Sequence, residues 1–250
     1  TMPVFVTKDG KYFVQGAIPM AEDASDTTPD TQAQQPANVP KSDKPKVQGF
    51  FFSYCPYGTQ IEKGLLSVLT TLKDKIDFQL KFVSYAMHGE KEVVENMNQY
   101  CIQKNYGREK LTSYLQCFLK DSDTKGCIQS SGFDAGALSA CTASVDKEFK
   151  VMELFNDKTK WENSSYPPFN TNKEDNVKYN VQGSPTLVVN GVELQSNRDS
   201  ASLLSTICGT FNNQPEECKA KLDTAAPTPG FGFDKKVTDA SATNAAQCNN

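Results

Sequence analysis

The residue best placed for chemistry is Cys55, in the segment Cys55-Pro56-Tyr57-Gly58. An apolar run over residues 47–54 precedes it and apolar residues at helical spacing follow, so the thiol is predicted where a buried strand gives way to a helix. Unpaired N–H groups and the helix dipole favour a thiolate there, and we expect the pKa of Cys55 to lie below the free value of ~8.5. Pro56 costs little at a helix start, because its missing N–H would be unpaired anyway. Thiolate is the attacking species in disulfide exchange, which is the chemistry that this position predicts.

The chain contains eight cysteines but no C-x-x-C pair, and its only histidine is His88. An even number of cysteines at loop-closing spacings indicates a disulfide framework made in an oxidising compartment. Zinc and iron–sulfur sites need ligands in tighter clusters, so disulfides are favoured over a metal site, and no cofactor is expected. We therefore expect an extracytoplasmic protein, whether secreted, periplasmic or at the cell surface. The sequon Asn163-Ser164-Ser165 fits export and makes Asn163 a candidate glycosylation site.

The positions of the cysteines suggest how they pair. The expected disulfides are Cys117–Cys127 across an acidic turn, Cys208–Cys218 across a short loop and, by a choice that the sequence does not settle, Cys101–Cys141. Cys55 and Cys248 then remain, which leads to the hypothesis that the C-terminal tail carries a resolving or blocking cysteine for Cys55. At roughly 3.3 Å per extended residue, residues 223–247 are long enough for this by a wide margin.

The elements that must position these residues can be followed along the chain. Residues 1–20 contain a predicted β-hairpin over residues 4–15, residues 21–46 form a polar linker, and residues 223–250 form a low-complexity tail. The main domain, residues 47–222, begins with strand, helix and strand in a βαβ unit. A helical insertion follows at about residues 90–160, read as three or four short helices pinned by two disulfides. Two strands joined by an Asn-Gly turn and a final helix over residues 199–208 complete a mixed α/β fold with a central sheet covered by helices.

Composition narrows the range of partners. The net charge is −4 with acidic and basic residues interspersed, which argues against nucleic acid or an anionic membrane as the main partner. No apolar run approaches the ~18 residues of a spanning helix. No signal peptide stands at the start, so the sequence looks like a mature or trimmed product. The acidic residues Glu62, Glu90, Glu92 and Glu95 are expected to form a solvated helix face.

A resemblance to the thioredoxin superfamily rests on two motifs: the cysteine-proline-aromatic segment at Cys55, and Gly183-Ser184-Pro185-Thr186 ahead of a strand. The resemblance implies that Pro185 is cis and lies beside the reactive cysteine. It also implies that the backbone before this proline pairs with an extended substrate segment. Substrate contacts are therefore expected at four residues: Pro56, Tyr57, Ser184 and Thr186. For Tyr57, the alternative is that its ring simply covers the start of the helix.

A second resemblance covers residues 88–101 and is to the gamma-interferon-inducible lysosomal thiol reductase family, whose signature reads H-G-x-x-E-C-x-x-N-x-x-x-x-C. Five residues match: His88, Gly89, Glu92, Asn96 and Cys101, while Val93 stands where the signature has its inner cysteine. The flanking elements resemble relatives of disulfide-bond protein A, and the likeness covers about residues 47–220. His88 is thus a candidate for tuning the thiol, with a structural role such as a helix cap as the alternative.

The main departure from these families is Gly58, which stands where active members carry the second cysteine of C-x-x-C. A lone thiolate forms mixed disulfides and shuffles them, but it cannot complete a two-electron oxidation by itself. The first hypothesis is therefore an exported, monothiol thiol–disulfide exchange protein, similar to an isomerase or oxidoreductase, that acts on cysteines of other proteins. The alternative is a catalytically silent thioredoxin-fold module of an extracellular or cell-surface assembly. In that case the N-terminal hairpin or the tail would mediate self-association.

Overall fold

The computed structural model of the chain describes residues 5–6, 13–14, 39–233, 236–237 and 248–249. The chain divides into two compact units, residues 1–31 and residues 32–250. In the first unit, β1 (Phe5–Val6) pairs antiparallel with β2 (Phe13–Val14). These strands lie within the hairpin predicted for residues 4–15. The turn between them and residues 15–38, which include most of the linker predicted for residues 21–46, lie outside the described residues.

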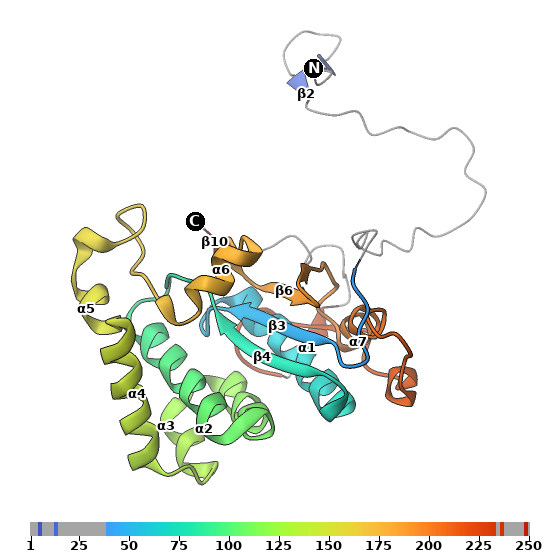
Figure 1. Cartoon of the computed structure of the whole chain (residues 1–250), viewed down its shortest axis with the longest axis horizontal. Helices are drawn as coiled ribbons and strands as arrows, with labels where there is room; N and C mark the ends of the chain where they lie inside the picture. Colours follow the sequence, from blue (N-terminus) through green and yellow to red (C-terminus); the bar gives the residue numbers. More distant parts are fainter. Residues whose placement is uncertain (1–4, 7–12, 15–38, 234–235, 238–247, 250) are drawn as a thin grey trace. The chain divides into compact units, whose positions relative to one another are not determined.

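The second unit is built on a four-stranded sheet in the order β4-β3-β6-β7 (Figure 1). β3 (Lys46–Phe51) is parallel to β4 (Asp77–Phe82), whereas β6 (Thr186–Val189) is antiparallel to both β3 and β7 (Val192–Glu193). Five of the six residues of β3 are buried, as expected for a central strand covered on both faces. Asn190 and Gly191 both have positive φ, 49° and 86°, which suits the tight turn between β6 and β7.

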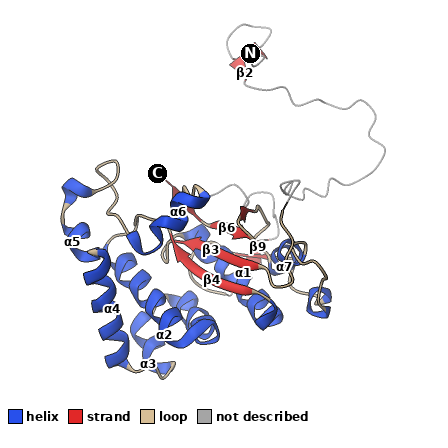
Figure 2. Cartoon of the chain, in the orientation of Figure 1, coloured by secondary structure: helices blue, strands red, loops and turns tan. Residues whose placement is uncertain are grey.

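Helices cover this sheet and extend beside it (Figure 2). The α-helices are α1 (Pro56–Leu72), α2 (Glu90–Asp121), α3 (Thr124–Ser130), α4 (Ala135–Phe149), α5 (Val151–Asn156), α6 (Lys173–Tyr179) and α7 (Ser200–Cys208). Short 3-10 turns lie at Lys73–Lys75, Lys158–Lys160, Asn170–Asn172 and Glu216–Lys219. The remaining strands are β5 (Gly183–Ser184), β8 (Ala226–Pro227), β9 (Lys236–Val237) and β10 (Cys248–Asn249). None of the helices in the described part of the chain is long and apolar enough to cross a membrane.

The helical insertion between β4 and β5 differs in detail from the short helices expected. Its first helix, α2, has 32 residues and is interrupted at Gly107, whose φ of 77° is a conformation that favours glycine. The insertion is linked by Cys101–Cys141, which joins α2 to α4, and by Cys117–Cys127, which joins α2 to α3. These are the two pairs expected there from the sequence. Cys208–Cys218, also expected, ties the end of α7 to the following 3-10 turn.

The outer edge of β4 is occupied by side-chain amides. The Gln103 side chain accepts a hydrogen bond from Leu80 N at 2.7 Å and donates one to Leu80 O at 3.0 Å. Asn172 Oδ1 accepts from Phe82 N at 2.9 Å, and Asn176 Nδ2 donates to Phe82 O at 2.9 Å. Main-chain groups of an edge strand that would otherwise face water are thus paired with side chains from α2, the 3-10 turn at 170–172 and α6.

Packing of the second unit continues beyond both boundaries expected from composition. Before residue 47, Ser42 exchanges backbone hydrogen bonds with Thr210 and Asn212. After residue 222, Ala226 is buried and Phe231 packs edge-on against Tyr54 and Phe118, with ring centroids 5.5 and 5.3 Å apart. We call residues 225–233 the C-terminal strap. A few anchoring side chains hold it to the domain although its composition is of low complexity.

Candidate active site

Cys55 is the N-cap of α1, as its place after an apolar strand predicted. The chain turns after β3 through a hydrogen bond from Cys55 N to Phe52 O at 3.0 Å, and Pro56 occupies the first turn of the helix. Gly58 N donates to Cys55 Sγ at 3.3 Å. This N–H is one of the donors that a helix leaves unpaired at its start, and together with the helix dipole it stabilises negative charge on the sulfur once the thiol is free.

The Gly183-Ser184-Pro185-Thr186 segment lies against the same sulfur. The Ser184–Pro185 peptide bond is cis, and Ser184 O is 3.4 Å from Cys55 Sγ. The Ser184 hydroxyl accepts a hydrogen bond from Phe52 N at 3.0 Å, which fixes the loop to the strand end that carries Cys55. Thr186 donates its hydroxyl to Gly183 O at 2.9 Å and pairs with Phe50 of β3, so its side chain holds the loop, and its contact with a substrate stays a prediction.

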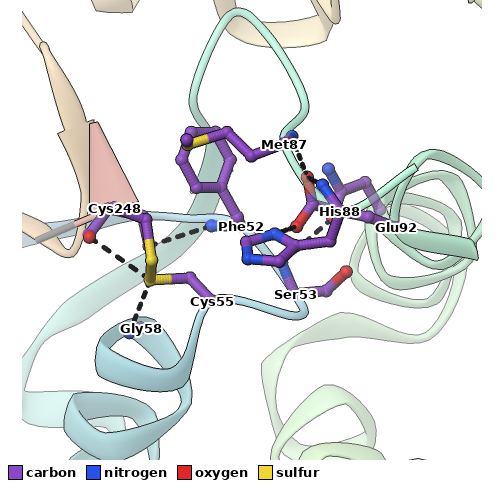
Figure 3. Close-up of polar contacts among 10 residues, drawn as sticks. Phe52, Ser53, Cys55, Gly58, Met87, His88, Glu92 and Cys248 are labelled. Atoms are coloured by element: carbon purple, nitrogen blue, oxygen red, sulfur yellow. Dashed lines mark hydrogen bonds and ion pairs between the residues drawn. A yellow bond between two sulfur atoms is a disulfide. The ribbon is translucent and has the colours of Figure 1, made fainter. Parts of the chain in front are cut away.

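Cys55 is joined by a disulfide to Cys248, and all eight cysteines are paired in the structure (Figure 3). Cys248 belongs to β10, which runs antiparallel to β5 with Cys248 opposite Ser184 and Asn249 opposite Gly183. The chain therefore places its own C-terminal segment on the backbone edge where the sequence resemblance predicted an extended substrate. The Cys55 side chain is fully buried beneath it, while Cys248 is half-buried.

The neighbours of Gly58 leave no space for a side chain at this position. A Cβ placed there would lie 2.6 Å from Ser184 Oγ and 3.3 Å from both Cys55 Cβ and Phe52 O. Carbon and oxygen atoms without a bond between them normally remain about 3.5 Å apart. The hydroxyl of Ser184 thus fills the space that a side chain at position 58 would need, and a second cysteine does not fit beside Cys55 as the loop stands.

His88 lies next to this site and pairs with a buried carboxylate. Its Nδ1 is 2.5 Å from Glu92 Oε2, while Glu92 Oε1 accepts from Met87 N at 2.8 Å. The imidazole is edge-on to Phe52 at 6.3 Å and, in Figure 3, reaches from Glu92 toward Phe52 and Cys55. His88 therefore belongs to the surroundings of the disulfide, and its role in tuning the thiol stays a prediction.

The topology and this loop together decide the fold. A parallel β3–β4 pair and an antiparallel β6–β7 pair share one sheet, and a cis-proline before β6 faces the cysteine at the start of α1. The chain has a thioredoxin fold. The fold class predicted from the sequence is confirmed, including the helical insertion between the two halves of the sheet.

Similarity to known proteins is found among solved structures, and the sequence identities are low. No family model and no curated protein matches this chain. Among solved structures, reduced DsbA of Mycobacterium tuberculosis is 17% identical, with a TM-score of 0.49 and coverage of 77% of this chain and 93% of that one. Reduced DsbG, a disulfide bond oxidoreductase of the same organism, is 15% identical, with a TM-score of 0.47 and coverage of 77% and 89%. Oxidised BdbD of Bacillus subtilis is 18% identical, with a TM-score of 0.45 and coverage of 73% and 92%.

Pro56 and Tyr57 follow Cys55 in the first turn of α1. The Tyr57 ring lies under the guanidinium of Arg198, 5.3 Å away, and packs against the small apolar cluster that contains Cys55 and Phe52. Burial lowers the pKa of Arg198 to about 10. Pro56 is exposed and its carbonyl accepts from Gly230 N of the strap at 2.9 Å, so the strap crosses the first turn of α1.

The expected solvated acidic face is wrong for three of its four members. Glu90 is exposed, but Glu62, Glu92 and Glu95 are buried where α1 packs against α2. Burial raises the pKa of Glu95 to about 7 although Gln99, Tyr114 and Thr124 donate to it. Burial, followed by the charge of Glu95, also raises the pKa of Glu62, neither of whose oxygens has a hydrogen-bond partner among the described residues.

The acids of α2 follow a pattern in the sequence that their polarity alone does not reveal. The α2 residues Glu92, Glu95, Asn96 and Gln99 recur at intervals of three and four, which places them on one helix face, and all four are buried. Glu62 lies seven residues after Cys55 on α1, so about 10 Å along the helix axis separates them. The strap is a second such feature: Phe231 and Phe233 in the tail indicate a docking contact, and Phe231 packs on Tyr54 and Phe118. Lys63 holds the strap through hydrogen bonds from Nζ to Thr228 O at 2.6 Å and Gly232 O at 2.7 Å.

The sequon residue Asn163 lies apart from these groups. It is exposed, has a φ of 48°, and its carbonyl accepts from the Ser165 hydroxyl at 3.1 Å in the turn after Trp161. An exposed turn suits a glycosylation acceptor, and glycosylation of Asn163 stays a prediction.

Proposed function

We propose that this protein exchanges disulfides with cysteines of other proteins, and that its exchangeable bond is Cys55–Cys248. The observation that carries the proposal is the position of that disulfide: Cys55 caps a helix beside cis-Pro185, and Cys248 lies in a strand on the β5 edge. A sulfur held at a helix N-terminus is a good leaving group, because the thiolate that departs is stabilised. With Gly58 in place of a nearby cysteine, Cys248 supplies the second sulfur of the redox pair.

Electrons balance over one full cycle. A client dithiol gives up two electrons and two protons and becomes a disulfide, while the Cys55–Cys248 bond takes up both and becomes two thiols. The reverse reaction reduces a client. When only Cys55 is available, the protein rearranges client disulfides without net electron transfer, which is the monothiol chemistry predicted from Gly58.

The four disulfides support a location outside the cytoplasm, because reducing systems in the cytosol keep cysteine thiols reduced. The partners proposed are cysteine-containing proteins. Self-association through the N-terminal hairpin or the tail remains the competing proposal for a protein that has no turnover.

The test is stoichiometric oxidation of a reduced, unstructured peptide with two cysteines by the oxidised protein. We expect one peptide disulfide per chain and two new protein thiols, at Cys55 and Cys248. C55S and C248S are expected to lose this reaction. The double variant C208S/C218S, which removes a disulfide away from the site, is expected to keep it. Peptide oxidation no faster than in buffer alone would favour the silent module.

A further inference from the structure

We propose that an incoming thiolate attacks Sγ of Cys248 and not Sγ of Cys55, so that the client becomes covalently attached to the C-terminal segment. This inference rests on the proposed function and specifies which sulfur is the electrophile. In the thioredoxin fold described above, the buried cysteine is the one at the helix N-terminus, and the accessible one lies at the end of the chain.

Access favours Cys248. The Cys55 side chain is fully buried, and its sulfur is enclosed by Ser184 O at 3.4 Å and Gly58 N at 3.3 Å. Figure 3 shows Gly58 on the side of Cys55 Sγ that faces away from the Cys248 sulfur. A thiolate attacks a disulfide in line with the bond that breaks, so an attack on Cys55 would have to come through the first turn of α1. Cys248 is only half-buried and lies on the outer side of the bond.

The leaving group favours the same direction. Attack on Cys248 expels the Cys55 thiolate into the N–H of Gly58 and the positive end of the α1 dipole. Attack on Cys55 would instead expel the Cys248 thiolate from a two-residue strand that has no helix terminus of its own. The better-stabilised thiolate leaves faster.

The first step is balanced as follows. The client thiolate forms a bond to Cys248 Sγ, the Cys55–Cys248 bond breaks, and its electron pair remains on Cys55 as a thiolate. A second client thiolate then attacks the client sulfur of the mixed disulfide, which forms the client disulfide and releases Cys248 as a thiolate. Two electrons have passed from the client to the protein, and no further oxidant is required for this turnover.

The strap gives this arrangement a mechanical consequence. Lys63 and Gln60 of α1 bind strap carbonyls, and Gly232 N donates to Leu119 O at 2.9 Å, independently of the Cys55–Cys248 bond. When that bond breaks, β10 keeps its short pairing with β5, and the strap stays attached through its own hydrogen bonds. A client on Cys248 is therefore covalently attached to a chain whose residues 225–233 are bound to α1 and α2.

The experiment maps the first mixed disulfide in the wild-type protein. The oxidised protein is mixed rapidly with glutathione, quenched in acid at a series of short times, alkylated and cleaved after lysine. This cleavage separates Cys55 in residues 47–63 from Cys248 in residues 237–250. When the ratio of the two labelling patterns is extrapolated to the earliest times, we expect glutathione on Cys248 and the alkyl group on Cys55. This pattern should exceed the opposite one by a factor on the order of ten.

A control shows that the opposite pattern would be detected. Reduced protein treated with glutathione disulfide provides the peptide of residues 47–63 that carries glutathione on Cys55, as a standard for yield. Glutathione found mainly on Cys55 at the earliest times would overturn the inference while leaving disulfide exchange intact. If glutathione opens the bond no faster than it opens an unstructured peptide disulfide, the proposed function fails, and this inference fails with it.

Discussion

The contact between Gly58 and Ser184 leads to a prediction that can be worked out in energy. A methyl group at position 58 would lie 2.6 Å from Ser184 Oγ, about 0.9 Å closer than an ordinary contact. The Ser184 side chain can yield only by rotating about χ1, which breaks its 3.0 Å hydrogen bond from Phe52 N. The substitutions G58A and S184A should therefore depend on each other.

The magnitudes follow from three contributions. Overpacking by G58A costs about 1–3 kcal/mol, while alanine in a helix is favoured over glycine by about 1 kcal/mol, for a net loss of about 1 kcal/mol. S184A leaves the buried N–H of Phe52 without its acceptor, at about 1–3 kcal/mol. In the S184A background the clash is gone and G58A should stabilise by about 1 kcal/mol. The expected coupling energy is thus about 2 kcal/mol.

The assay is urea unfolding of the four proteins of this double-mutant cycle, with all disulfides intact and the free energy of unfolding obtained by linear extrapolation. G136A serves as the matched control. A Cβ at Gly136, near the start of α4, meets only Asp134 Oδ1 at 3.2 Å, so the same substitution there should add to S184A without coupling. A coupling energy between G58A and S184A below about 0.5 kcal/mol would refute the reasoning, because independent sites show that much scatter.

Two further outcomes are expected. In the C248S background, G58C combined with S184A should form a disulfide with Cys55 on reoxidation and leave no free thiol at the site. G58C without S184A should leave both thiols titratable. Equal thiol counts in the two proteins would contradict this. Burial raises the pKa of Glu95 to about 7, so between pH 4.5 and 7 the native state keeps a proton that the unfolded chain has lost. The free energy of unfolding should therefore fall by about 3 kcal/mol over this range and stay level above pH 7. E95Q should flatten this slope in urea unfolding at a series of pH values, and an unchanged slope would show that other groups cause it.

Features that depend on local rules were accessible from the sequence. The strand-to-helix position of Cys55 follows from the change of periodicity at residue 55, and the turn between β6 and β7 from Asn190-Gly191. The disulfides Cys117–Cys127 and Cys208–Cys218 follow from the short spacing of their cysteines, whereas Cys101–Cys141 was a choice that the sequence did not settle. The thioredoxin fold and cis-Pro185 came from the family resemblance, because a local sequence says little about the isomer of a proline bond.

Features that depend on distant parts of the chain were not accessible. Glu62 carries charge in the sequence, and only the packing of α1 on α2 makes it a buried acid. The strap is held by carbonyl groups that accept from Lys63 and Gln60, and a carbonyl is present at every residue, so nothing in the composition of residues 225–233 marks it as an acceptor. The fit of Gly58 against Ser184 joins two residues 126 positions apart.

The amide groups along β4 have a consequence for how this protein meets other chains. A sheet whose outer strand offers free N–H and C=O groups invites any extended polypeptide to extend the sheet, and an exchange protein meets unfolded chains as its clients. Gln103, Asn172 and Asn176 occupy these groups at Leu80 and Phe82. Under the proposed function, we expect an unfolded client to be kept from Leu80 and Phe82 of β4 and to pair instead with β5, whose two residues open once the C-terminal strand is released. We expect selectivity for chains that carry a cysteine to depend on the paired edge of β4 as much as on the free edge of β5.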